Sequence, residues 1–192
     1  MAEYILRPGP FTPIRKLVLN ADYIRYDNGL NDSTTHLAKA DIVDFRHGMD
    51  WIRWYRFVVG RRFSVAFKDR NDRELRIVFS SYFGINRHYD QLYADIVNDV
   101  WSLYHQEKVD RYLWMIADGQ QVILKGITLE REGIVFPKTS LVPWPRIGMS
   151  EYYNYFALFD RDDPQVHWRI SYNEYETELL WSIAKSLIQK DN

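Results

Sequence analysis

The chain has 192 residues, of which 46% are hydrophobic and 27% charged, and its formal net charge at pH 7 is -1. A charge this close to zero gives no overall field toward polyanions, so we expect no nucleic-acid partner. The chain contains no cysteine, which excludes disulfides, thiolate metal sites and a cysteine nucleophile.

The N-terminal segment does not resemble a targeting signal. Residues 1–13 lack the basic start and apolar run of a signal peptide. No stretch of the sequence reaches the roughly 20 apolar residues of a transmembrane helix. We therefore expect a soluble, cytoplasmic protein.

The first half of the chain contains a series of strand signals. Residues 17–26 predict a hairpin, with apolar side chains on both sides of a polar turn at 20–22. A short strand is predicted at 42–49 and a longer one at 55–68, bent at Gly60. A further half-buried strand is predicted at 73–80, where charged and apolar residues alternate.

Each half of the chain ends in a helical pattern. Apolar residues recur at steps of three and four, which predicts one buried helix face in each half. A carboxylate stands near the start of each pattern, at Asp90 and Glu176, where it suits the helix dipole. The residues predicted to be buried are Leu92, Ile96, Val100, Leu179, Ile183 and Leu187.

The two halves also align with each other. Residues 4–26 align without a gap on 114–136, so that Gly9 meets Gly119 and Leu19 meets Leu129. Residues 40–49 align on 140–149 and pair Arg46-x-Gly-Met with Arg146-x-Gly-Met. We therefore predict a mainly β protein with C-terminal helices, built from two tandem copies at 1–108 and 109–192. The linker 106–111 is short, so we expect the copies to touch, and the turn glycine Gly133 is predicted to have positive φ.

Four segments carry a resemblance to a known superfamily: ITLEREGIVF at 127–136, SLVPWPRIGM at 140–149, and the two terminal helices. They resemble the bacterial branch of the pleckstrin-homology-like superfamily. The resemblance implies two bent antiparallel β-barrels or sandwiches, each capped by one α-helix. It also implies lipid or protein binding, and the mostly acidic turns at 20–22 and 130–132 argue against phosphoinositides and favour a protein or peptide.

Signals for catalysis or metal binding were not found. The five histidines have no ligand-like spacing, and the chain has neither a nucleophile elbow nor a phosphate loop. Asp160, Asp162 and Asp163 are interpreted as an exposed hairpin turn, as is the equivalent run 69–72. We expect no enzyme activity, no catalytic residues, no metal and no cofactor.

The segment 46–62, RHGMDWIRWYRFVVGRR, is the strongest candidate for a ligand site. The planar guanidinium of arginine forms paired hydrogen bonds with phosphate or carboxylate, and tryptophan is favoured at membrane interfaces. Strand alternation would place Arg61 and Arg62 on opposite faces, unless a bulge at Gly60 brings three arginines to one side. The candidate anion-binding residues are Arg46, Arg53, Arg56, Arg61, Arg62, Trp51 and Trp54. The alternative interpretation is an amphipathic strand pair with solvated arginines and buried rings.

Three functional hypotheses follow from these observations. The first is a non-enzymatic binding or scaffolding module with a protein or peptide partner. The second is a membrane-surface or polyanion binder that works through 46–62. The third is a small-ligand-binding β-barrel, suggested by the seven Trp and fourteen Tyr.

Overall fold

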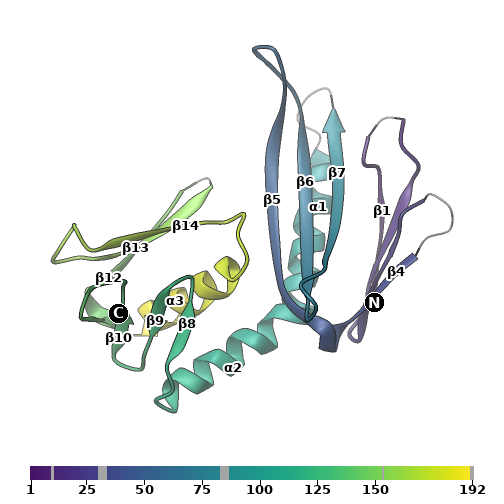
Figure 1. Ribbon diagram of the computed structural model, residues 1–192. Helices are drawn as coiled ribbons and strands as arrows, with labels where there is room; N and C mark the ends of the chain where they lie inside the picture. The colour runs from purple at the N-terminus through teal and green to yellow at the C-terminus, as the bar shows by residue number, and fades with distance from the viewer. Residues whose placement is uncertain (10, 30–33, 83–86, 153, 191–192) are drawn as a thin grey trace. The chain divides into compact units, whose positions relative to one another are not determined.

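The computed structural model describes residues 1–9, 11–29, 34–82, 87–152 and 154–190. The chain divides into two compact units, residues 1–105 and 106–192, which are described separately (Figure 1). The division expected after residue 108 therefore falls inside a helix that belongs to the second unit.

Unit 1 contains two antiparallel sheets and a helix. The first sheet has the order β1-β2-β3-β4, and a 3-10 turn, η1, leads into the second, β5-β6-β7. The chain then forms α1 and a π-helical turn, η2. The elements are β1 (Ala2–Leu6), β2 (Arg15–Leu19), β3 (Tyr23–Asp27), β4 (Thr34–Ala38), η1 (Lys39–Asp41), β5 (Ile42–Trp54), β6 (Phe57–Asp69), β7 (Glu74–Tyr82), α1 (Arg87–Val100) and η2 (Trp101–His105).

Unit 2 begins with a helix and then follows the same order. A four-stranded sheet, β11-β10-β9-β8, leads through a 3-10 turn into a three-stranded sheet, β12-β13-β14, and a C-terminal helix. The elements are α2 (Gln106–Ala117), β8 (Val122–Leu124), β9 (Ile127–Leu129), β10 (Gly133–Val135), β11 (Leu141–Pro143), η3 (Trp144–Arg146), β12 (Ile147–Glu151), β13 (Tyr155–Asp160), β14 (His167–Ser171) and α3 (Thr177–Lys190). The fold is mainly β, as predicted, but none of the sheets closes into a barrel within the described residues.

The aligned hairpins adopt the same turn. The N–H of Asn20 donates to the carbonyl of Tyr23 at 2.9 Å, and the N–H of Glu130 donates to the carbonyl of Gly133 at 2.9 Å. The second aligned block is out of register. Ile42 and Ile147 open the corresponding strands β5 and β12, whereas the alignment pairs Ile42 with Val142. The Arg-x-Gly-Met match is therefore not structural.

The start of the second copy differs from the alignment. Tyr4 lies in strand β1, but its aligned partner Trp114 lies in helix α2. Residues 106–111, predicted to be a linker, form the first half of α2, and Val109 is buried in the core of unit 2. The apolar face of this helix provides the burial that keeps the segment helical. Gly119 follows the helix at φ 82°, where its N–H donates to the carbonyl of Ile116.

Each unit has its own hydrophobic core, and the predicted helix faces pack against it. Ile96 and Val100 of α1 lie against rings of β6 and β7, among them Phe63 and Phe79. Leu179 and Ile183 of α3 lie in the core of unit 2 with Phe156 and Leu158. Burial is thus confirmed for Ile96, Val100, Leu179 and Ile183, while Leu92 and Leu187 are partly buried.

The reason predicted for Gly133 is wrong. Its φ is not positive. The residue is glycine because β10 and β11 approach closely there: a Cβ on Gly133 would lie 2.1 Å from the carbonyl oxygen of Val142. No side chain fits without moving one of the two strands.

Candidate functional site

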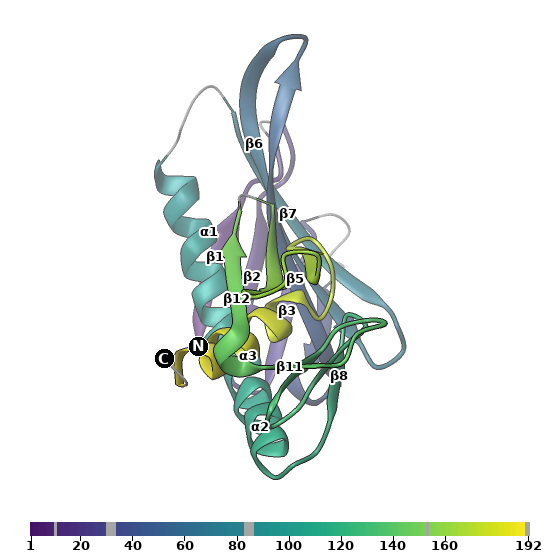
Figure 2. The same cartoon turned by 90° about the vertical axis from the view of Figure 1, so that its left-hand side faces the viewer.

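A long hairpin extends from the second sheet of unit 1. Strands β5 and β6 have 13 residues each, so β5 is not the short strand ending at Met49 that was predicted. The third strand, β7, pairs with β6 only as far as Gly60, opposite Tyr82. The residues beyond it form a two-stranded ribbon that projects past β7 (Figure 1, Figure 2). We call residues 52–58 the hairpin tip.

A β-bulge marks the base of the hairpin tip. Ile52 pairs with Gly60 and Arg53 pairs with Val58, so Val59 has no partner across the ribbon. Gly60 allows β6 and β7 to approach closely, because a Cβ there would lie 2.2 Å from the carbonyl oxygen of Ser81. Below the bulge, regular pairing resumes, and strands twist more strongly at such irregularities.

The turn of the hairpin tip holds a bulky residue in an unfavourable conformation. Tyr55 has φ 52°, a left-handed value that glycine and asparagine adopt far more readily. The residue is 90% exposed, so packing against the described residues compensates little for the strain. Strained residues of this kind cluster at functional sites.

Replacing Tyr55 by glycine is expected to raise the stability of unit 1 by up to about 1 kcal/mol, because glycine adopts positive φ without strain. Chemical denaturation of the purified protein measures the change. Arg56→Gly is the matched control at the neighbouring turn position, where φ is not positive, and it should give no gain. A lower stability for Tyr55→Gly would show that the tyrosine stabilises the turn.

Large apolar side chains are exposed together on the hairpin tip. Trp54 and Phe57 face each other across the ribbon and are 68% and 73% exposed. The Trp54 ring lies 6.1 Å from the ring of Tyr55 at the turn. Val58 is exposed on the opposite face, next to Arg53. The interpretation that the rings are core is therefore wrong for the tip, and exposed apolar clusters of this kind mark interaction sites.

The arginines of the candidate set fall into two groups. The guanidinium of Arg61 is buried and forms a double ion pair with the Asp90 carboxylate at 2.5 and 2.8 Å. It also lies over the rings of Trp51 and Phe63. Arg46 pairs with Glu74 at 2.8 Å. Because these two charges are already compensated, they stabilise the unit and contribute little to an anion site.

The remaining arginines are exposed. Arg53, Arg56 and Arg62 form no ion pair with any residue that the structure describes. Arg53 and Arg56 belong to the hairpin tip, while Arg62 lies below the bulge, opposite Asp50. The register places Arg61 and Arg62 on opposite faces, so the bulge does not bring three arginines to one side.

A second exposed loop lies at the same end of unit 1. The β1–β2 loop carries Phe11, 99% exposed, and Ile14, 53% exposed. It reaches the same end of the unit as the hairpin tip in both views (Figure 1, Figure 2). The N–H of Ser80 in β7 donates to the carbonyl of Arg7 at 3.3 Å and fixes the base of this loop. Two separate segments at this end of unit 1 thus carry exposed apolar residues.

Several residues of this surface were not among the predicted site residues. Tyr55 and Phe57 flank Arg56 in the sequence Trp54-Tyr-Arg-Phe57. Three aromatic residues within four positions are visible in the sequence. Phe11 stands between proline-rich residues far from the segment, and only the fold shows which end of unit 1 it shares.

Unit 2 has no projecting ribbon of this type among its described residues. Its corresponding strands, β12 and β13, have five and six residues. Near their connection, the rings of Tyr152 and Tyr155 stack at 4.5 Å, and the guanidinium of Arg169 lies 4.1 Å from the centre of the Tyr155 ring. These aromatic groups contact each other, and Tyr152 is 52% exposed.

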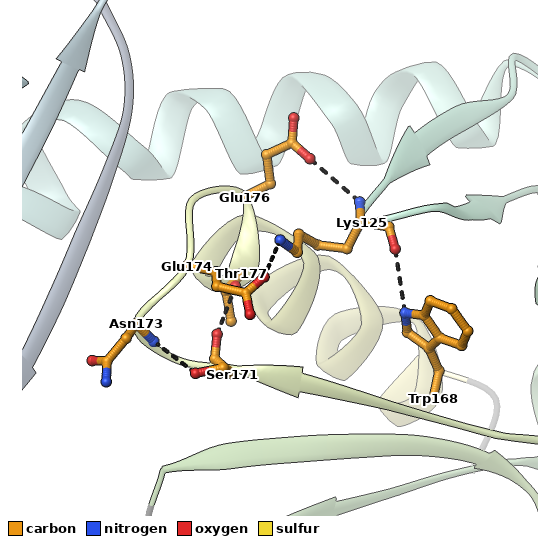
Figure 3. A network of polar contacts seen from close by, with 7 residues as sticks. All are labelled: Lys125, Trp168, Ser171, Asn173, Glu174, Glu176 and Thr177. Carbon is orange, nitrogen blue, oxygen red and sulfur yellow. Dashed lines mark hydrogen bonds and ion pairs between the residues drawn. The ribbon is translucent and has the colours of Figure 1, made fainter. Parts of the chain in front are cut away.

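The β8–β9 turn of unit 2 carries a cation, but its charge is compensated (Figure 3). The ammonium of Lys125 forms an ion pair with Glu174. The backbone N–H of Lys125 donates to the carboxylate of Glu176 at 3.3 Å. The indole N–H of Trp168 donates to the Lys125 carbonyl at 3.2 Å. Lys125 therefore connects the turn to the segment before α3 and is not available for an anionic ligand.

The acidic runs behave as turns, as predicted, but each begins with a buried carboxylate. Asp160 accepts hydrogen bonds from the Asp162 N–H at 3.0 Å and from Arg146 at 2.5 and 3.1 Å. Burial by itself raises the pKa of this carboxyl, but these hydrogen bonds outweigh it and hold the pKa below its usual value. Asp69 has a lowered pKa for the same reasons, with Arg73 and the Asn71 N–H as donors.

Both carboxyls predict the same acid response. A group whose pKa is lower in the folded state contributes stability above its unfolded value, about 4, and this contribution is lost as the pH falls further. Thermal unfolding should therefore show a falling Tm below about pH 4. Asp160→Asn should flatten this dependence, whereas exposed Asp118→Asn should not. Identical acid profiles for both variants would contradict the assignment.

The described residues contain no group of three His, Asp or Glu side chains that could hold a metal ion. No helix in the described part of the chain is long and apolar enough to cross a membrane. No family model, curated protein or solved structure matches this sequence or fold. The hairpin tip is therefore assessed on its own geometry.

Proposed function

We propose that this chain is a non-enzymatic protein that binds anionic membrane surfaces through the hairpin tip of unit 1. The observation that supports this function is the exposure of three rings, Trp54, Tyr55 and Phe57, at the end of a projecting ribbon that also carries the exposed Arg53 and Arg56. The segment 51–59 contains no carboxylate. Positive charge and exposed rings are thus concentrated in one small structure.

The two kinds of side chain suit different layers of a bilayer surface. Tryptophan and tyrosine are stabilised at the headgroup level, where the ring is apolar and its polar atom remains hydrated. Each arginine near an anionic surface contributes about 1 kcal/mol, and guanidinium binds phosphate oxygens well. The exposed Phe11 on the neighbouring loop adds a further apolar contact at the same end.

The order of elements supports two related proposals. Each unit follows the order of four strands, a 3-10 turn, three strands and a helix, and antiparallel strands followed by one helix are also what the pleckstrin-homology-like resemblance implies. We propose that the chain arose by internal duplication of such a unit and that only unit 1 acquired the hairpin tip. A cytoplasmic location, as expected from the sequence, would bring this tip to the anionic cytoplasmic leaflet.

Vesicle sedimentation tests the function. Wild-type protein should bind phosphatidylcholine vesicles that contain phosphatidylglycerol and should bind pure phosphatidylcholine weakly. Trp54→Ser/Phe57→Ser and Arg53→Glu/Arg56→Glu should each reduce binding by at least about tenfold, which corresponds to roughly 1.4 kcal/mol. Binding should also fall as salt rises from about 0.1 M to about 1 M, because the screening length shrinks from about 10 Å to about 3 Å.

Matched controls lie in unit 2. Trp114 is 63% exposed, so Trp114→Ser removes an exposed indole outside the tip. Arg131→Glu/Arg161→Glu makes the same charge change at two exposed positions. Both controls should bind as wild type does. Equal binding by the tip and control variants, or no binding by wild type, would contradict the proposed function, and equal binding to vesicles with and without anionic lipid would contradict the preference for anionic surfaces.

A further inference from the structure

Unit 1 also contains a groove between the edges of its two sheets. Its volume is about 480 Å³, and it is lined by the end of β3 and the residue Asn28 after it, by β4, by the end of β6 with the turn that follows, and by β7. Most of the lining side chains are polar. None of the lining residues belongs to the hairpin tip.

Two strand edges border this groove. β4 is the last strand of its sheet, and β7 is the last strand of the other. Three consecutive residues of each line the groove, Thr35–Leu37 and Glu74–Arg76. The side chains of consecutive strand residues point to opposite faces of the sheet. Three consecutive residues can therefore all line the groove only if the edge of the strand, with its backbone N–H and C=O groups, borders it.

Few backbone bonds cover these edges. Outside the ladders, the described residues form a single backbone hydrogen bond to β7, from the N–H of Ser80 to Arg7, and none to β4 between Thr35 and Leu37. Backbone groups alternate between the two edges of an antiparallel strand, and Arg76 is in phase with Ser80, so the N–H and C=O of Arg76 face the outer edge of β7 and lack a backbone partner among the described residues. An exposed edge of this kind accepts an additional strand.

The charges at the groove favour an acidic ligand. Asp69 is bonded to Arg73, and Glu74 is paired with Arg46. Arg76 is exposed and forms no ion pair with a described residue. The carboxylates are therefore compensated from within the unit, and a guanidinium remains for an incoming carboxylate.

We propose that an extended peptide binds in this groove by adding a strand to the edge of β7, with an acidic side chain of the peptide on Arg76. Backbone hydrogen bonds to β7 supply affinity, and the Arg76 ion pair supplies preference for acidic sequences. This site is separate from the hairpin tip and does not depend on membrane binding.

Selection from a library of random displayed peptides tests the proposal. Wild-type protein should enrich peptides that contain Asp or Glu among β-branched residues. Arg76→Glu should lower recovery of these peptides by at least about tenfold, whereas Arg131→Glu, an equal charge change on an exposed residue of unit 2, should not. No enrichment by wild type, or equal recovery by Arg76→Glu, would overturn the proposal.

The most enriched peptide, synthesised alone, distinguishes strand addition from binding through side chains only. Methylation of its backbone nitrogens should weaken the Kd by at least about tenfold, because the ladder bonds are lost. Bound peptide should also slow hydrogen exchange of amides in β7. Unchanged exchange in β7, or full affinity of the methylated peptide, would refute strand addition. Trp54→Ser/Phe57→Ser should bind the peptide normally, so failure of the membrane function and failure of this site are distinguishable.

Discussion

Replacing Ile183 by alanine should lower the free energy of unfolding of unit 2 by about 2–5 kcal/mol. Ile183 is fully buried on α3 and belongs to the core that α3 shares with Phe156 and Leu158. Alanine removes apolar contacts and leaves a cavity that close-packed neighbours fill only partly. A typical domain has only about 5–15 kcal/mol of stability, so this loss removes a large share of the free energy that keeps unit 2 folded.

Urea denaturation followed by tryptophan fluorescence measures this loss. The matched control is Ile123→Ala in the same unit, because the Ile123 side chain is 69% exposed. Its effect should remain within about 0.5 kcal/mol. Two equal midpoints for Ile183→Ala and wild type would mean that α3 does not pack through this face.

Replacing Gly133 by alanine is expected to cost about 1–3 kcal/mol or more, although only one methyl group is added. The new Cβ would lie 2.1 Å from the carbonyl oxygen of Val142 and 2.9 Å from the Cα of Pro143. Both are backbone atoms, so β10 and β11 must separate and their hydrogen bonds must lengthen.

Gly9→Ala provides the control for this substitution. Gly9 has no positive φ, and its nearest neighbours to an added Cβ are side-chain atoms of Thr12 at 3.5 and 3.7 Å. Alanine should therefore be tolerated there within about 0.5 kcal/mol. Thermal unfolding of the two variants gives the comparison, and an unchanged Tm for Gly133→Ala would show that the strands are less closely packed than described.

The helices and the hairpin at 17–26 were predictable because their signals are local. Apolar spacing of three and four residues specifies a helix with one buried face, and Ile96 and Ile183 are buried on such faces. The same signal was present at Val109, Leu113 and Ile116 of α2. A linker at 106–111 and an alignment of Trp114 with Tyr4 both conflict with this local signal, and the helix formed by residues 106–117 agrees with it.

The candidate site was only partly predictable. The sequence identifies Arg53, Arg56 and Trp54 as residues of an Arg/Trp segment, since they lie close together in the chain. It does not show that Arg61 is compensated by Asp90 or Arg46 by Glu74. These partners are distant in sequence, and only the packing of α1 against the second sheet and the pairing of β7 with β6 within that sheet bring them together.

The sequence by itself determined that this protein is mainly β and that each half contains a helix with one buried face. It also determined that aromatic and basic residues concentrate in 46–62. These properties depend on residue type and short-range periodicity, which act within a few turns of chain. Only the tertiary structure decided which rings are exposed. Trp54 and Phe57 lie in strands as Phe63 does, but β7 pairs with β6 only as far as Gly60, so within the described residues of unit 1 no third strand covers the tip, whereas Phe63 packs against Tyr93 of α1. Burial is a property of what packs against a residue, and that partner is supplied by distant parts of the chain.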